Sequence, residues 1–343
     1  MIRLTTSADI PQLKEIWKNT FGDSDSFVNW LFSQRFSPEL SACAREDGKI
    51  VSCMHGCLLP INLGATVVPA VLISGVATLP EYRRKGLMGK VFRYLIHHLH
   101  SLDIPMVFYR PENPDVYRFL GHVHISQAID AQNALAEKTT CGNIKNVDIS
   151  RVLPLLYDCY QSFSRRYSMT VNRGDYFFTK MNEYIYCNLN CRAVYSKGKI
   201  QAYVIYSREN GKLLCDETVG DPDMLYKLLS SMEKPFSAKL PPDFPYGGLS
   251  GNAMLKDDLM GGIVSISALL KAYNSSCPYI IEVSDSVFPE TCGVYDFSGN
   301  KTKKPADIKL SAGELLQLLA GYRVPSEFSD YFKMRKCYTT DPY

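Results

Sequence analysis

The chain is most informative at Gly75-Val76-Ala77-Thr78-Leu79-Pro80-Glu81-Tyr82-Arg83-Arg84-Lys85-Gly86-Leu87-Met88. A strand rich in Val, Leu and Ile ends in this segment, a short basic loop follows, and a helix opens at Gly86. The free N–H groups and the positive dipole end of such a helix favour phosphate oxygens. Gly86 and Gly89 allow a ligand to approach the backbone closely. The segment therefore predicts a phosphate-binding loop, whereas the plain alternative is a solvated basic turn.

The segments on either side of this loop are typical of a mixed α/β unit. Along the first 125 residues, alternating apolar residues indicate strands, turn signals separate them, and helical spacing of apolar residues indicates helices. The predicted elements are a strand at Ile2–Leu4, a helix from Thr6 or Ser7 to about Phe21, strands at Lys49–Leu59 and about Thr66–Thr78, a helix after Gly86 and a strand at Met106–Tyr109.

In its order of residues, the segment resembles motif A of the GNAT acyl-CoA N-acetyltransferases. One departure is Met88, where many members carry a second Gly or Ala. The resemblance implies that backbone groups of the strand end pair with the pantetheine arm of acetyl-CoA, while loop amides hold its pyrophosphate. It implies no metal. The cofactor-binding residues that it implies are Val76, Ala77, Thr78, Arg83, Arg84, Lys85, Gly86, Leu87, Met88 and Gly89.

A second segment, Tyr117-Arg118-Phe119-Leu120-Gly121-His122, resembles the Y-x-x-x-G-F segment of the same family. The resemblance implies that the Tyr117 hydroxyl protonates the coenzyme A thiolate as it leaves. A tyrosine with a pKa of about 10 stays protonated at neutral pH, which suits this role. The alternative is a packing tyrosine among 22 in the chain. An aromatic residue is usual at the position of His122. This histidine is either a base or a ring on the pocket wall, and we favour the role as a ring on the wall.

The pattern partly recurs later in the chain. Gly198-Lys199-Ile200 leads a strand as Gly48-Lys49-Ile50 does, and Val219-Gly220-Asp221-Pro222 precedes a helix as residues 76–80 do. Leu225–Leu228 replaces the basic glycine loop. We interpret this part as a repeat of the fold without its phosphate loop.

The Pro- and Gly-rich stretch over residues 241–251 predicts a second boundary. Beyond it, helical patterns lie near Ile266–Tyr273 and Ala312–Ala320, with strand-like runs at Tyr279–Val283 and Gly293–Phe297.

This succession of units resembles the Eis (enhanced intracellular survival) acetyltransferases. Their basic loop matches residues 83–88, residues 314–323 match the helix of their sterol-carrier-like last domain, and Thr340-Asp341-Pro342-Tyr343 resembles their chain end. The expected fold class is α/β (α+β) with an acyl-CoA N-acyltransferase fold. The expected domains are a catalytic GNAT domain at 1–135, a GNAT-like domain without the phosphate loop at 136–250, and a sterol-carrier-protein-like domain at 251–343 whose tail enters the active site.

The resemblance implies an acetyl-CoA-dependent N-acetyltransferase that acts directly on a primary amine, in an aminoglycoside-like polyamine, a peptide lysine or a metabolite. An aliphatic ammonium has a pKa of about 10.4, so a base is needed. In the resembling family the terminal carboxylate reaches the active site, which makes the Tyr343 carboxylate the implied base. His55, His122 and Glu112 are the alternatives. Members can form hexamers, so a homo-oligomer is open.

Two other functions remain open. One is a non-catalytic protein that binds coenzyme A, or a lipid in its last domain, because a fold alone does not determine function. The other is transfer of a longer acyl group, since N-myristoyltransferases also join two GNAT folds.

Composition limits the partners. The 343 residues are 46% hydrophobic and 21% charged, as in ordinary globular proteins, and the net charge of +3 is too small to indicate nucleic acid or a membrane surface. No apolar run of about 18 residues predicts a membrane span, and the start turns polar before a signal-peptide core could form. The expected location is the cytoplasm.

The eleven cysteines are odd in number and scattered, which favours reduced thiols over a disulfide framework. In Cys53-Met54-His55-Gly56-Cys57, alternate residues of a strand lie roughly 6.5–7 Å apart, which suits a zinc ion poorly. We therefore expect buried small residues there and no metal.

Overall fold

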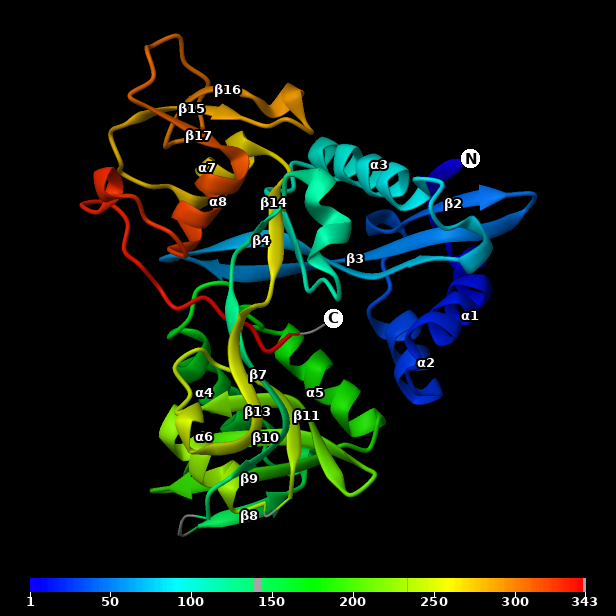
Figure 1. Ribbon diagram of the computed structural model, residues 1–343, viewed down its shortest axis with the longest axis vertical. Coiled ribbons are helices and arrows are strands. Elements are labelled where there is room, and N and C mark those ends of the chain that lie inside the picture. Colours follow the sequence, from blue (N-terminus) through cyan, green and yellow to red (C-terminus); the bar gives the residue numbers. More distant parts are fainter. Residues whose placement is uncertain (139–142, 233, 342–343) are drawn as a thin grey trace.

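The computed structural model describes residues 1–138, 143–232 and 234–341. Within these ranges the strands form two seven-stranded sheets and one three-stranded sheet. Figure 1 shows two lobes: the upper one holds the first sheet and the three-stranded sheet, and the lower one holds the second sheet. The C-terminal segment, drawn in red, runs between the lobes.

The first sheet has the order β1-β2-β3-β4-β5-β14-β6. Its strands are β1 Ile2–Leu4, β2 Ala42–Glu46, β3 Lys49–Leu63, β4 Thr66–Thr78, β5 Met106–Tyr109, β6 Val123–His124 and β14 Met260–Ile263. The strands predicted near the basic loop are confirmed, and β3 extends to Leu63. The parallel pair β4 and β5 is joined only at Val71 with Val107 and at Leu72 with Phe108. Beyond Leu72, β4 therefore diverges from β5.

Helices cover both faces of this sheet. On one face lies α3 (Leu87–Ser101), and α1 (Ile10–Phe21) and α2 (Asp25–Gln34) lie on the other (Figure 1). Five apolar side chains of α3 are buried against the sheet: Val91, Phe92, Leu95, Ile96 and Leu99. Burying one such side chain contributes roughly 1.5–3 kcal/mol, so these five residues stabilise the packing of α3 on the sheet.

The second sheet has the order β13-β7-β12-β11-β10-β9-β8. Its strands are β7 Gln127–Ala136, β8 Ile144–Val147, β9 Asn190–Ser196, β10 Lys199–Glu209, β11 Lys212–Gly220, β12 Phe236–Leu240 and β13 Leu249–Asp257. Its helices are α4 Leu153–Ser164, α5 Tyr176–Tyr186 and α6 Pro222–Ser230. The series β9 to β12, antiparallel twice and then parallel, repeats the series β2 to β5. The predicted repeat of the fold is confirmed.

The last unit is a small sheet of order β16-β15-β17, with β15 Ile280–Ser284, β16 Gly293–Asp296 and β17 Ile308–Ser311. The two predicted helices are present as α7 Ile266–Tyr273 and α8 Ala312–Ala320. A reciprocal cap starts α8, because Ser311 and Glu314 bond to each other's backbone N–H groups.

Two strands cross the boundaries expected from the sequence. β7 begins at Gln127 and ends at Ala136, so it lies almost wholly in the range expected for the first domain, yet it pairs with β12 and β13 in the second sheet. β14 follows residue 251, yet it lies between β5 and β6 in the first sheet. These positions are decided by pairing between strands that are far apart in the sequence. β5 is a central strand, so its backbone N–H and C=O groups need hydrogen-bonding partners on both sides, and β14 provides them on the side away from β4. These strands therefore tie the two sheets together.

Among the described residues, no helix is long and apolar enough to cross a membrane.

Candidate active site

A cavity of about 780 Å³ opens beside the start of α3, where β4 leaves β5. Nine of the ten predicted cofactor-binding residues line it: Val76, Ala77, Thr78, Arg83, Arg84, Gly86, Leu87, Met88 and Gly89. The exception is Lys85, whose Nζ lies 4.7 Å from the centre of the Tyr82 ring. The loop and the strand end thus face one space.

A bulge in β4 shapes the strand side of this cavity. Cys53 pairs with Ala77 and His55 pairs with Ser74, so β4 has one more residue than β3 between these pairs. Gly75 has a φ of +58°, and a Cβ there would collide with the Trp17 ring. A bulge bends its strand and increases the local twist. The end of β4, residues 76–78, therefore lies along the cavity wall.

The helix side of the cavity is a free N-terminus. Gly86 is the N-cap residue of α3, with a φ of +71° and no side-chain cap, and nothing described lies within 4 Å of where its Cβ would be. The first N–H groups of α3 are thus free to bind an anion. Arg83 donates from Nε to the carbonyl oxygen of Thr78 at 3.1 Å, which fixes the loop against the strand.

Sequence reasoning missed several residues of this cavity. Lys90 and Arg93 line it from α3, and Thr20 and Phe21 line it from the end of α1. Helical spacing from Gly86 places residues 89, 90 and 93 on one face of the helix, so the signal for the two cations was available. No local signal points to residues of α1.

Tyr117 lies where this cavity meets a second one of about 330 Å³. The second cavity is also lined by Ser74, Gly75, Arg110 and Glu112. The Tyr117 ring packs 4.7 Å from the Tyr109 ring, centre to centre. Burial raises the pKa of Tyr117 to about 12. The hydroxyl is therefore protonated at neutral pH and can act as an acid.

The two candidate histidine bases lie in apolar surroundings. His122 Nδ1 lies 2.9 Å from the Tyr109 hydroxyl, and His55 packs among the rings of Trp17, Phe32 and Phe36. Burial lowers the pKa of each histidine to about 3. Both rings are neutral at pH 7, and neither is among the residues that line the two cavities. Glu112, the third alternative, lines both.

The other predicted base, the Tyr343 carboxylate, lies outside the described residues. The tail that leads to it is held between the lobes, since Tyr338 N donates to Ser168 O at 2.9 Å. Thr339 O accepts from Arg110 Nη2 at 3.4 Å, and Thr339 and Thr340 line a third cavity of about 180 Å³ with Arg110. Arg110 also lines the second cavity beside Tyr117. Arg110 thus contacts the tail at Thr339 and also lines the Tyr117 cavity.

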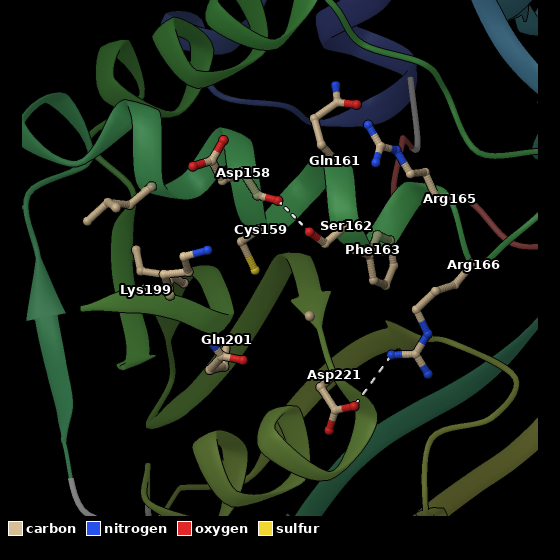
Figure 2. A pocket seen from close by; sticks show the side chains of 13 residues that line it. Asp158, Cys159, Gln161, Ser162, Phe163, Arg165, Arg166, Lys199, Gln201 and Asp221 are labelled. Carbon is tan, nitrogen blue, oxygen red and sulfur yellow. Dashed lines mark hydrogen bonds and ion pairs between the residues drawn. The ribbon is translucent and has the colours of Figure 1, made fainter. Parts of the chain in front are cut away.

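The second sheet has a pocket of its own, of about 530 Å³, between α4, β10 and the start of α6 (Figure 2). Here the helix start is occupied, because the Asp221 carboxylate accepts from the N–H groups of Asp223 and Met224 at 3.1 and 3.3 Å. Figure 2 shows Asp221 facing Arg166, and their charged groups lie 3.6 Å apart. This pocket therefore lacks the free helix N-terminus of the first.

Two family models match parts of the chain. Residues 1–125 match the acetyltransferase (GNAT) domain, and residues 266–338 match the sterol carrier protein domain. A search of curated protein sequences found no significant match.

Several solved structures share the fold over nearly the whole chain. A protein of Enterococcus faecalis described as a probable N-acyltransferase is 18% identical, with 96% of this chain and 92% of that chain covered and a TM-score of 0.76. A GCN5-related N-acetyltransferase of Anabaena variabilis is 16% identical, with both chains covered completely and a TM-score of 0.76. Eis1 of Mycobacterium abscessus is 14% identical, again with complete coverage of both chains and a TM-score of 0.72. At these identities the likeness shows the fold.

Proposed function

We propose that this chain, an acyltransferase with a GNAT domain at residues 1–125 and a sterol carrier protein domain at residues 266–338, is an Eis-type N-acetyltransferase that uses acetyl-CoA. GNAT enzymes use acyl-CoA donors, and acetyl-CoA is the donor proposed here. The observation that carries the proposal is the single cavity that joins the uncapped start of α3, the divergent end of β4 and the Tyr117 ring. The free N–H groups at the start of α3 can bind the pyrophosphate of acetyl-CoA, and the unpaired edge of β4 can form hydrogen bonds with its amide-bearing pantetheine arm.

The proposed reaction is a direct transfer. The neutral amine nitrogen attacks the thioester carbonyl carbon, and a β4 N–H group donates to the oxygen that becomes negative. The new C–N bond then replaces the C–S bond. Tyr117 gives its proton to the departing sulfur, and the base takes the proton that the amine nitrogen loses.

The base in this proposal is the terminal carboxylate of Tyr343. Its support is the course of the tail to Arg110, and the apolar surroundings of His55 and His122. An α-carboxylate with a pKa of about 3.3–3.7 is ionised at pH 7 and can accept a proton. Desolvation would raise this pKa and make the group a stronger base.

The acceptor in this proposal is a primary amine of a small molecule or a peptide, and the location is the cytoplasm. The described cysteines are free thiols, as is typical of proteins kept in a reducing compartment. The resemblance to the Eis acetyltransferases also suggests a homo-oligomer.

The test is the release of free thiol from acetyl-CoA with a panel of amines: a polyamine, an aminoglycoside and a lysine peptide. We expect amine-dependent thiol release, and a product heavier than the amine by one acetyl group in mass spectrometry. Propionyl-CoA and longer acyl-CoA donors are run in parallel. Coenzyme A binding without turnover of any amine would favour a binding protein, and faster turnover of a long acyl group would favour the other alternative.

A further inference from the structure

The second cavity, beside Tyr117, has a charged wall formed by Arg110. This arginine directly follows β5 and lines both the second cavity and the third one of about 180 Å³. The second cavity shares Glu112, Val116 and Tyr117 with the first. In the proposed function the donor fills the first cavity and its thioester ends at Tyr117, so the acceptor approaches from the second. Arg110 therefore lies where the rest of the acceptor molecule is bound.

Arg110 is held by one edge of its guanidinium group. Its Nε donates to Asp258 Oδ1 and its Nη2 to Asp258 Oδ2, both at 2.8 Å, and this carboxylate is buried. Nη2 also donates to Thr339 O at 3.4 Å, whereas Nη1 donates to none of the described residues. Burial alone would lower the pKa of Arg110, but Asp258 outweighs burial and raises it. A charged guanidinium of fixed direction thus keeps its Nη1 for a ligand.

An arginine held in this way fits a second carboxylate. The planar guanidinium matches the two oxygens of a carboxylate better than any other side chain does. The chain itself contains such an arrangement, because Arg173 Nη1 donates to Glu217 Oε1 at 3.0 Å while its Nη2 lies 3.2 Å from Asp341 Oδ1. One buried arginine there binds two carboxylates. A ligand carboxylate on Arg110, opposite Asp258, would repeat that arrangement.

The other charges of these cavities fit a molecule that carries both signs. Lys239, a second cation, lines the third cavity with Arg110. Among the acids, Glu112 lines the second cavity and Asp216 the third. Burial raises the pKa of Asp216 to about 6, so most of it is ionised at pH 7. A polyamine would bring only cations towards Arg110 and Lys239, whereas an amine with a carboxylate finds a partner for each of its charges.

We propose that the acceptor carries a carboxylate as well as the primary amine, and that Arg110 binds this carboxylate. A free diamino acid and a peptide with a free C-terminus both have this chemistry. The inference rests on the proposed function, in which an amine attacks acetyl-CoA beside Tyr117. Arg110 is then a specificity-determining residue, and Asp258 is a positioning residue that acts through Arg110.

Lysine and cadaverine (1,5-diaminopentane) test this proposal, because they differ only in the carboxylate. The binding of each to the protein saturated with coenzyme A is measured by isothermal titration calorimetry. A hydrogen bond to a charged group corresponds to about a 10- to 100-fold change in affinity, so lysine should bind more tightly than cadaverine by about that factor. The dipeptide Gly-Lys, with its C-terminus free or amidated, tests a peptide as the source of the carboxylate.

Arg110→Lys keeps a positive charge beside Asp258 but loses the planar edge. It should remove most of the preference for lysine and leave coenzyme A affinity unchanged, because Arg110 does not line the first cavity. Arg3→Lys is the matched control: Arg3 also pairs with a buried carboxylate, that of Asp9, and lines none of the three cavities. It should keep the full preference. Arg110→Gln combined with Asp258→Asn removes both charges, leaves no buried carboxylate unpaired, and should give the same loss if Arg110→Lys does not fold.

Turnover with acetyl-CoA gives a second readout. Lysine should have the higher kcat/KM of the pair, and Arg110→Lys should raise the KM for lysine more than it changes kcat. The proposal is overturned if the wild type binds neither member of either pair, binds both members equally or prefers the one without a carboxylate, or if Arg110→Lys keeps the preference. If lysine binds in the expected Arg110-dependent way and no amine is acetylated, the failure belongs to the proposed function.

Discussion

Gly86 and Asp221 are the N-cap residues of the helices that follow β4 and β11, but only Asp221 fills its helix start with its own carboxylate. The two sheets otherwise share the same series of strands. A carboxylate at this place takes the N–H groups that a phosphate needs and repels the phosphate charge. One position thus distinguishes a helix that is open to a coenzyme A pyrophosphate from one that is closed.

The first prediction introduces a carboxylate at the open helix. Gly86→Glu should abolish coenzyme A binding in isothermal titration calorimetry, because it brings negative charge and bulk to the start of α3. Gly86→Ala is the control, since the φ of +71° strains any residue with a Cβ by roughly 1–2 kcal/mol. Alanine should therefore weaken binding only in part. Equal affinity of the folded Glu and Ala variants would remove the phosphate-binding role of this loop.

The second prediction concerns the acid. Tyr117→Phe removes one hydroxyl at the junction of the two cavities and almost no volume. General acid catalysis typically contributes 10²–10⁴-fold, so kcat should fall by about that factor while acetyl-CoA affinity stays nearly the same. Tyr94→Phe, on the exposed side of α3, should have no effect. If Tyr117→Phe works at the full rate, Tyr117 is a packing residue.

The sequence predicted the local parts of the site because local signals determine them. The strand end, basic loop and helix occupy consecutive residues, and Gly86 supplies the left-handed backbone that the turn requires. Sequence reasoning assigned no helix to α2 or α5. It also gave no sign that β14 inserts beside β5, because Met260-Gly261-Gly262-Ile263 is too short and too rich in glycine to be recognised as a strand.

The buried charge cluster of Arg173, Glu217 and Asp341 could not be predicted, for a different reason. Arg173, Glu217 and Asp341 are far apart in the sequence, and each is an ordinary charged residue that is expected at the surface. Their meeting depends on the packing of the tail against the second sheet. Long-range contacts of this kind leave no periodic pattern, so only the structure connects the chain end with Arg173.

The third prediction concerns stability and pH. Burial holds the pKa of His55 at about 3 in the folded protein, below its ordinary value of 6.5. Between these values the unfolded chain binds a proton that the folded protein refuses, so stability falls as the pH falls from 6.5 towards 3. The slope is roughly 1.4 kcal/mol per pH unit for this histidine.

Replacing the buried imidazole ring of His55 removes its contribution to the pH dependence of stability. His55→Phe keeps the contacts with Trp17 and Phe32 but cannot bind a proton. Urea unfolding at pH 7, 6 and 5 should therefore show a shallower loss of stability for His55→Phe than for the wild type. His122, which is also buried, contributes equally to both, and substitution of the exposed His100 serves as the control. Equal slopes in the wild type and His55→Phe would contradict the prediction.

The last prediction returns to Asp221. Its carboxylate caps α6 and also faces Arg166, so two contributions must be separated. Asp221→Asn keeps an oxygen for the N–H groups and loses the ion pair, whereas Asp221→Ala loses both. An exposed ion pair is worth about 0–1 kcal/mol, and losing an N-cap costs about 1 kcal/mol. Urea unfolding should thus show Asp221→Ala clearly less stable than Asp221→Asn, with coenzyme A affinity unchanged because the first cavity lies in the other sheet. If the two variants are equally stable, the carboxylate does not cap α6, and the contrast with Gly86 has another cause.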